Sequence, residues 1–325
     1  MRRHAIGWLV VVGSGGSGGC GSDPAAVTGD AAIGDAPADA GSCGARGGPR
    51  GLSRREVMID GLRRTYLVYL PASASTATGL PLVFVHHGYT MSGQLMHDIT
   101  GYAALADTEQ IALAFPDGQG GPNANKAPWN VGSDLCPSYF GAPPTAMGDD
   151  FALLDAIEAD ISADQCLDRD HVFVTGFSMG GYFAHHAGCM RDDIAGIAPH
   201  SGGTHSLDAC ATAKKPVIIF HGLTDALIPA GCNDPDSTPV QNVVPAATAW
   251  AQRNGCSLTA TRVDVMGGTC MVYDGCPEGG QVELCTFTNM GHCWAGGASG
   301  AGIYACPSYA DATRLEWQFF KQYAW

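Results

Sequence analysis

His171-Val-Phe-Val-Thr-Gly-Phe-Ser-Met-Gly-Gly181 is the stretch of sequence that decides the fold. Its first five residues are mainly β-branched or aromatic, which predicts a buried strand, and residues 182–189 can form a helix. A Gly-x-Ser-x-Gly motif between a strand and a helix is typical of a tight turn that projects the serine hydroxyl above the edge of a sheet. Ser178 is therefore the candidate nucleophile, and an ordinary turn serine is the alternative.

Strand-like and helix-like segments alternate on both sides of this motif. Apolar spacing predicts helices near residues 150–161, 243–254 and 312–323, and a hairpin is expected at 57–70. Short apolar runs typical of strands span residues 82–86, 111–115, 171–175, 194–199, 216–221 and 281–288. Such alternation predicts an α/β fold with a mostly parallel central sheet that carries helices on both faces.

The order of residues after the serine predicts a catalytic triad. A serine hydroxyl needs a base, and in folds with this serine turn the acid and then the histidine follow along the chain. Asp225 follows the predicted strand 216–221, and His292, the only histidine beyond Asp225, follows the last predicted strand. We expect Ser178, Asp225 and His292 to act together. Turn and surface roles are the alternative, and the substitute acids are Asp208, Asp234 and Asp264.

Acyl transfer also needs N–H donors for the developing oxyanion. The N–H of Met179, next after the nucleophile, is one candidate, and the N–H of Tyr89, in the loop after an early strand, is the second. His86 and His87 precede that loop. Adjacent strand residues point to opposite faces, so we expect a structural role for this pair and not a shared metal ion. No step calls for a metal or a cofactor.

Thirteen cysteines indicate an oxidising compartment. The chain has no Cys-x-x-Cys pair and no His-Glu-x-x-His motif, which favours disulfides over zinc. We expect bridges that each close a loop of about 13 to 21 residues. The expected pairs are Cys189–Cys210, Cys256–Cys276 and Cys293–Cys306.

The first 50 residues differ in composition from the rest. Residues 1–20 resemble a lipoprotein-like export signal, with a charged start, a short apolar stretch and small residues before Cys20. Lipidation of Cys20 would tether the protein to a membrane, and a plain secretory signal is the alternative. Residues 21–50 are mostly small or polar, which predicts a disordered linker before a domain at 51–325. We expect an extracellular or cell-surface protein.

Charge and hydrophobicity exclude two classes of protein. The net charge, 17 − 31 = −14, argues against nucleic acid as a partner, since phosphate contacts need clustered Lys and Arg. A hydrophobic content of 46% excludes a wholly disordered chain.

Six segments resemble the polyhydroxybutyrate depolymerase/feruloyl esterase family of α/β-hydrolases, which includes acetylxylan esterases. They are the hairpin 57–71, His87-Gly88, Trp129-Asn130, the serine turn 176–181, His221-Gly-Leu-Thr-Asp225 and Gly291-His-Cys-Trp-Ala-Gly296. The resemblance covers about residues 57–325. It implies an α/β-hydrolase fold in a single disulfide-stabilised domain, and ester hydrolysis by Ser178, His292 and Asp225 without metal or cofactor.

The resemblance leaves the substrate open. No added substrate-binding domain is visible in the sequence, which favours plant cell-wall esters, feruloyl or acetyl esters of xylan, over poly(3-hydroxybutyrate). Trp129 and Trp294 are candidates for a platform that stacks an aromatic acid or a sugar, and packing inside the protein is the alternative. A serine peptidase and a non-catalytic surface-binding module on the same scaffold are the competing functions.

Overall fold

The computed structural model describes residues 48–74, 78–124, 126–131, 148–204, 207–208, 210–228 and 239–325, without the side chains of 239–242. All of these residues belong to one compact unit. Among them, no helix combines the length and the apolar character needed to cross a bilayer. The expectations for the export signal, for Cys20 and for most of the linker concern residues 1–47, which lie outside the described residues.

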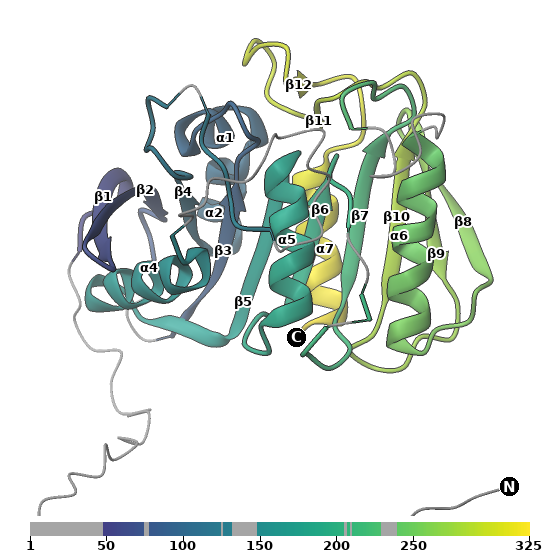
Figure 1. Cartoon of the computed structure of the whole chain (residues 1–325), viewed down its shortest axis with the longest axis horizontal. Coiled ribbons are helices and arrows are strands. Elements are labelled where there is room, and N and C mark those ends of the chain that lie inside the picture. Colours follow the sequence, from purple (N-terminus) through teal and green to yellow (C-terminus); the bar gives the residue numbers. More distant parts are fainter. Residues whose placement is uncertain are drawn as a thin grey trace, which may run out of the picture. The chain divides into compact units, whose positions relative to one another are not determined.

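A ten-stranded sheet forms the centre of the unit (Figure 1), in the order β1-β2-β4-β3-β5-β6-β7-β10-β9-β8. The strands are β1 (Gly51–Ile59), β2 (Leu62–Leu70), β3 (Leu80–His86), β4 (Ala112–Pro116), β5 (Leu167–Phe177), β6 (Gly196–His200), β7 (Val217–Gly222), β8 (Ala260–Val265), β9 (Gly268–Tyr273) and β10 (Val282–Phe287). The six strands from β4 to β10 in the sheet order are parallel. Antiparallel pairs flank them at both edges.

Helices cover both faces of this sheet, as the alternation of elements predicts (Figure 1). One face packs against α4 (Asp150–Asp164), α5 (Met179–Met190) and α6 (Pro239–Asn254). The other packs against α1 (Gly93–Thr100), α2 (Tyr102–Glu109) and α7 (Ala312–Tyr323). A small parallel pair, β11 (Trp294–Ala295) and β12 (Ala305–Cys306), lies beyond the carboxyl ends of the parallel strands.

The structure confirms the predicted hairpin, the six predicted strands and the three predicted helices. Asp149 caps α4, because its carboxylate accepts hydrogen bonds from Phe151 N (2.9 Å) and Ala152 N (3.1 Å). The hairpin begins at Gly51, earlier than its apolar pattern suggests. β1 is an edge strand in which half-buried and exposed residues alternate, so charged side chains interrupt the apolar pattern.

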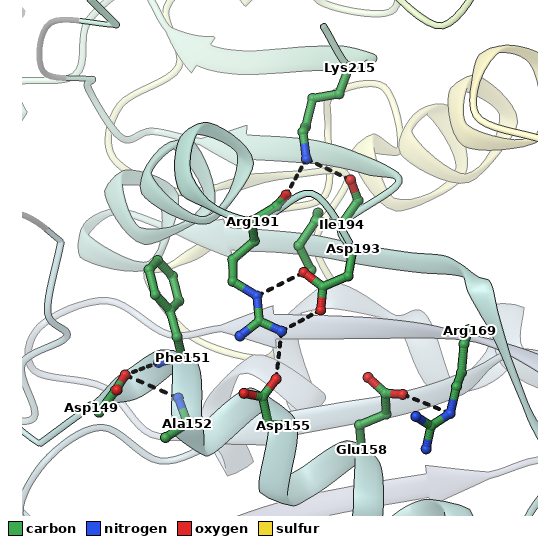
Figure 2. A network of polar contacts seen from close by, with 10 residues as sticks. All are labelled: Asp149, Phe151, Ala152, Asp155, Glu158, Arg169, Arg191, Asp193, Ile194 and Lys215. Atoms are coloured by element: carbon green, nitrogen blue, oxygen red, sulfur yellow. Dashed lines mark hydrogen bonds and ion pairs between the residues drawn. The ribbon is translucent and has the colours of Figure 1, made fainter. Parts of the chain in front are cut away.

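A polar network holds the C-terminal end of α5 in place (Figure 2). Arg191 Nη2 contacts Asp155 of α4 at 2.5 Å, and Arg191 Nε donates to Asp193 Oδ1 at 2.8 Å. Lys215 Nζ donates to the backbone oxygens of Arg191 (2.6 Å) and Ile194 (2.7 Å), and burial lowers the pKa of Lys215 to about 8. The network fixes the end of α5 that lies opposite to Ser178.

Every cysteine in the described part of the chain belongs to a disulfide. The bridges Cys189–Cys210, Cys256–Cys276 and Cys293–Cys306 are confirmed. A fourth bridge, Cys270–Cys285, joins directly opposite residues of β9 and β10. It was not predicted, because the pairing depends on the register between β10 and a strand whose sequence has no clear apolar run.

Candidate active site

The serine turn has the strained geometry that its sequence predicts. Ser178 lies between β5 and α5 with φ 58° and ψ −117°, a conformation that non-glycine residues rarely adopt. A Cβ atom on Gly176 would overlap the backbone of Gly180, and one on Gly180 would overlap the backbone of His86. The glycines therefore let the chain fold tightly enough to present Ser178 at the carboxyl end of the parallel strands.

Asp225 and His292 reach the same edge of the sheet from two neighbouring strands. Asp225 follows β7 and His292 follows β10, and these strands are parallel neighbours. His292 Nδ1 lies 2.7 Å from Asp225 Oδ2. Oδ1 of the same carboxylate accepts hydrogen bonds from Leu227 N (2.9 Å) and Ile228 N (3.0 Å), which leaves Oδ2 facing the histidine.

His292 also lies next to the serine turn. Its ring centroid is 4.6 Å from that of Phe177, the residue before Ser178. The substitute acids are not in this position. Asp208 and Asp264 are exposed, and Asp264 pairs with a neighbouring arginine on β8. Asp234 lies outside the described residues.

The electrostatics of the pair favour an ionised carboxylate. Burial alone would raise the pKa of Asp225, but the hydrogen bond and charge interaction with His292, together with His221, hold that pKa below its usual value. His221 Nε2 lies 3.7 Å from Asp225 Oδ2, and burial lowers the pKa of His221 to about 4. Since the carboxylate accepts, His292 Nδ1 carries the proton and Nε2 can accept another one.

The two expected oxyanion donors belong to segments on either side of Ser178. Met179 is the first residue of α5, where backbone N–H groups have no partner within the helix. The loop that contains Tyr89 lies against the serine, since a Cβ on Gly88 would be 3.1 Å from Ser178 Cβ. The Tyr89 carbonyl accepts a hydrogen bond from Ala127 N (2.8 Å). The oxyanion roles remain predictions.

The structure contradicts the exposed stacking platform expected at Trp129 and Trp294. Both side chains are fully buried. Trp129 Nε1 donates to His87 O (2.8 Å), and Trp294 Nε1 donates to Thr313 Oγ1 (3.1 Å). Each indole has its polar atom satisfied inside the protein and packs against other rings, which agrees with the packing alternative.

His86 and His87 are buried as neutral rings. Burial lowers the pKa of His86 to about 3 and that of His87 to about 4. His87 Nε2 accepts a hydrogen bond from Gly118 N (2.8 Å), so this ring connects two loops, which agrees with the expected structural role. Within the described ranges, no group of three or more His, Cys, Asp or Glu side chains is arranged to hold a metal ion.

Sequence reasoning did not single out His200, which lies at the same edge of the sheet. It ends β6, the strand between those that lead to Ser178 and to Asp225. The position of this histidine at the end of a third predicted parallel strand was the only sequence feature that could have indicated it. It resembled the other buried histidines of the chain too closely to be distinguished from them.

Comparisons with known proteins find esterases among the similar sequences. The Esterase family model matches residues 59–202. Feruloyl esterase B of Piromyces equi is 26% identical over 279 residues, which cover 80% of this chain and 45% of that enzyme. Poly(3-hydroxyalkanoate) depolymerase C of Paucimonas lemoignei is 24% identical over 289 residues, covering 74% of this chain and 63% of the depolymerase.

A solved structure supports the fold. Acetyl xylan esterase from Aspergillus awamori superimposes with a TM-score of 0.55 and 16% identity, covering 74% of this chain and 94% of that one. This match and the sheet topology define an α/β-hydrolase fold. In sequence, the chain is similar to carboxylic ester hydrolases of the polyhydroxybutyrate depolymerase/feruloyl esterase family.

Proposed function

We propose that the protein is a serine carboxylic ester hydrolase that works through Ser178, His292 and Asp225. One observation carries the proposal: the 2.7 Å contact between His292 Nδ1 and Asp225 Oδ2. It lies at the sheet edge where a strained turn presents Ser178. A serine, a histidine and a buried carboxylate in this order along the chain are the elements that acyl transfer requires.

In the proposed reaction, Ser178 Oγ attacks the ester carbonyl while His292 Nε2 takes its proton. The N–H groups of Met179 and Tyr89 stabilise the oxyanion of the tetrahedral intermediate. His292 then gives the proton to the leaving alkoxide, which departs as an alcohol and leaves an acyl-serine ester. Water repeats the sequence and releases the acid. Asp225 stays ionised and stabilises the charged imidazole.

For the substrate we propose plant cell-wall esters, namely feruloyl or acetyl esters of xylan, in polymeric or small form. The support is the similarity to a feruloyl esterase. The sequence favours the same esters. Poly(3-hydroxybutyrate) is the alternative substrate, because a polyester depolymerase is similar at nearly the same identity. A non-catalytic surface-binding module is the alternative from another class.

We also propose that the protein is exported and works outside the cell or at its surface. The support is the disulfide bonding of every cysteine in the described ranges, which is typical of oxidising compartments. The predicted signal at residues 1–20 would direct export, and lipidation of Cys20 would add a membrane tether.

A substrate panel tests the proposal. It consists of methyl ferulate, acetylated xylan, a short-chain nitrophenyl ester and a polyhydroxybutyrate film, each with the full chain and with Ser178→Ala. The control variant is Ser257→Ala, which changes an exposed serine in the turn after α6. We expect Ser178→Ala and His292→Ala to lose almost all turnover, because triad members act as one unit, while Ser257→Ala stays active.

Turnover by Ser178→Ala above a few per cent of wild type would contradict the triad. Binding to a polymer without hydrolysis of any member of the panel would favour the non-catalytic module. Faster release of ferulate or acetate than of hydroxybutyrate is the expected order, and the reverse order would favour the depolymerase.

A further inference from the structure

His200 lies between the segments that carry the proposed catalytic residues. It is fully buried at the end of β6. In the sheet it stands opposite Phe177, the residue before Ser178, and opposite Phe220 on β7, the strand that leads to Asp225. His200 is therefore in the middle of the edge at which the proposed site lies.

Two hydrogen bonds connect His200 to the proposed nucleophile and to the loop that contains the proposed base. Its backbone oxygen accepts a bond from Ser178 N (2.9 Å). Its side-chain Nε2 accepts a bond from Ala295 N (3.1 Å), three residues after His292. One residue thus contacts the serine turn through its backbone and the histidine loop through its imidazole.

The neighbours of Ala295 explain why this side-chain bond matters. The N–H groups of Trp294 and Gly296 donate to Tyr304 O (2.8 Å) and Cys306 O (2.9 Å), in the segment of β12. These bonds hold the β11–β12 pair together but do not connect it to the main sheet. The N–H of Ala295 points the other way, to His200, and connects the histidine loop with the end of β6.

The surroundings of His200 define one chemical form of its ring. A backbone N–H can only donate, so Nε2 must be unprotonated and the proton resides on Nδ1, 3.4 Å from Ser201 Oγ. The ring stacks on Trp294 (centroid distance 4.5 Å) and on Phe220 (5.5 Å). Burial, together with the charges of His221 and His292, lowers the pKa of His200 well below its usual value and keeps the ring neutral.

We propose that His200 is a positioning residue whose unprotonated Nε2 fixes the distance between Ser178 and His292. The proposal rests on the proposed ester hydrolysis. Without the acceptor, β11 and β12 stay paired but lose a bond to the sheet, and His292 moves relative to the serine. A displacement of about 1 Å in a catalytic constellation can cost about a hundredfold in rate.

Three variants of the full chain test this role with a short-chain nitrophenyl ester. His200→Phe keeps a stacking ring and removes the acceptor, while His200→Gln places an amide oxygen near the position of Nε2. The matched control is His185→Phe. His185 is another fully buried histidine, on α5, and its Nδ1 accepts a hydrogen bond from Trp250 Nε1 of α6 (2.9 Å), not from the histidine loop.

For His200→Phe we expect kcat per titrated active site to fall about 10- to 100-fold, with KM changed less than about twofold. For His200→Gln we expect kcat within about threefold of wild type, since the acceptor is retained. His185→Phe should keep the wild-type kcat even where its unfolding midpoint falls as far as that of His200→Phe. A loss of kcat in His200→Phe but not in His185→Phe therefore distinguishes a positioning role from a general loss of stability.

Any of three results overturns the proposal: kcat of His200→Phe within about twofold of wild type, no recovery in His200→Gln, or an equal loss of kcat in His185→Phe. The ¹⁵N spectrum of histidine-labelled wild-type protein tests it without any variant. His200 must be the Nδ1–H tautomer, and the Nε2–H tautomer contradicts the proposal. If the ester hydrolysis itself is wrong, Ser178→Ala stays active, so the two failures are distinguishable.

Discussion

Asp225→Asn removes the charge of the proposed acid while preserving its shape, and the structure defines how the new amide must lie. Leu227 N and Ile228 N both donate to Oδ1, so the amide oxygen must occupy that place and the NH₂ group must face His292. A facing NH₂ donor makes Nδ1 of His292 an acceptor and moves its proton to Nε2. That nitrogen can then no longer take the proton of Ser178.

We therefore expect kcat of Asp225→Asn to fall about ten thousandfold, as for a triad histidine in the wrong tautomer, which is about 5.5 kcal/mol in activation free energy. Steady-state hydrolysis of a nitrophenyl ester measures the fall, and urea unfolding checks the fold. Asp264→Asn, at an exposed substitute acid on β8, is the matched control and should keep wild-type kcat. Residual activity above about a tenth of wild type would refute the tautomer argument.

Replacing both Cys293 and Cys306 by alanine should lower the free energy of unfolding by about 3 kcal/mol, because the bridge spans a sequence separation of 13; an unchanged urea midpoint would contradict this. The same double variant should lower kcat, since the bridge begins next to His292, and wild-type kcat would show that the loop is held without it. Acidification from pH 7 to 5 should lower the free energy of unfolding by about 3 kcal/mol in urea titrations. Four buried histidines cause the loss, namely His86, His87, His200 and His221. Burial lowers their folded-state pKa values below the unfolded value of about 6.5. The stability that they contribute above that pH is therefore lost on acidification, because the unfolded chain takes up protons that the folded protein does not. Burial raises the pKa values of Glu316 and Glu283 to about 8 and about 7. These two carboxyl groups therefore stabilise the fold on acidification and offset about half of the loss. A free energy of unfolding that rises toward pH 5 would show that the glutamates outweigh the histidines. Incubation with a chelator should leave kcat/KM unchanged, since side chains perform every proposed step, and a loss that zinc restores would contradict the mechanism.

The parallel centre of the sheet was predictable because its strands are buried on both faces. β3 and β7 have every residue buried and therefore read as unbroken apolar runs. β8 was missed for the opposite reason: it lies at the edge of the sheet, and four of its six residues are exposed. Its charged side chains, Arg262 and Asp264, hide the strand in a sequence search based on apolar patterns.

The candidate site likewise has a part that the sequence predicts and a part that it does not. Chain order and strand ends are properties of the sequence, so Ser178, Asp225 and His292 could be selected without a structure. The bond between Ala295 and His200 joins residues 95 positions apart, and no local pattern indicates it. The burial of Trp129 likewise depends on a hydrogen bond to His87, 42 positions away.

The four disulfides whose partners are described share one feature: the cysteines of each pair are 13 to 21 residues apart. The entropic cost of bringing two thiols together grows with the length of chain between them. Loop length alone does not select these pairs, because Cys276 lies nearer to Cys270 in the sequence than Cys285 does, and Cys293 lies nearer to Cys285 than Cys270 does. Oxidative folding must therefore bring β9 and β10 into register before Cys270 can be joined to Cys285, so formation of this bridge reports that this part of the sheet has assembled.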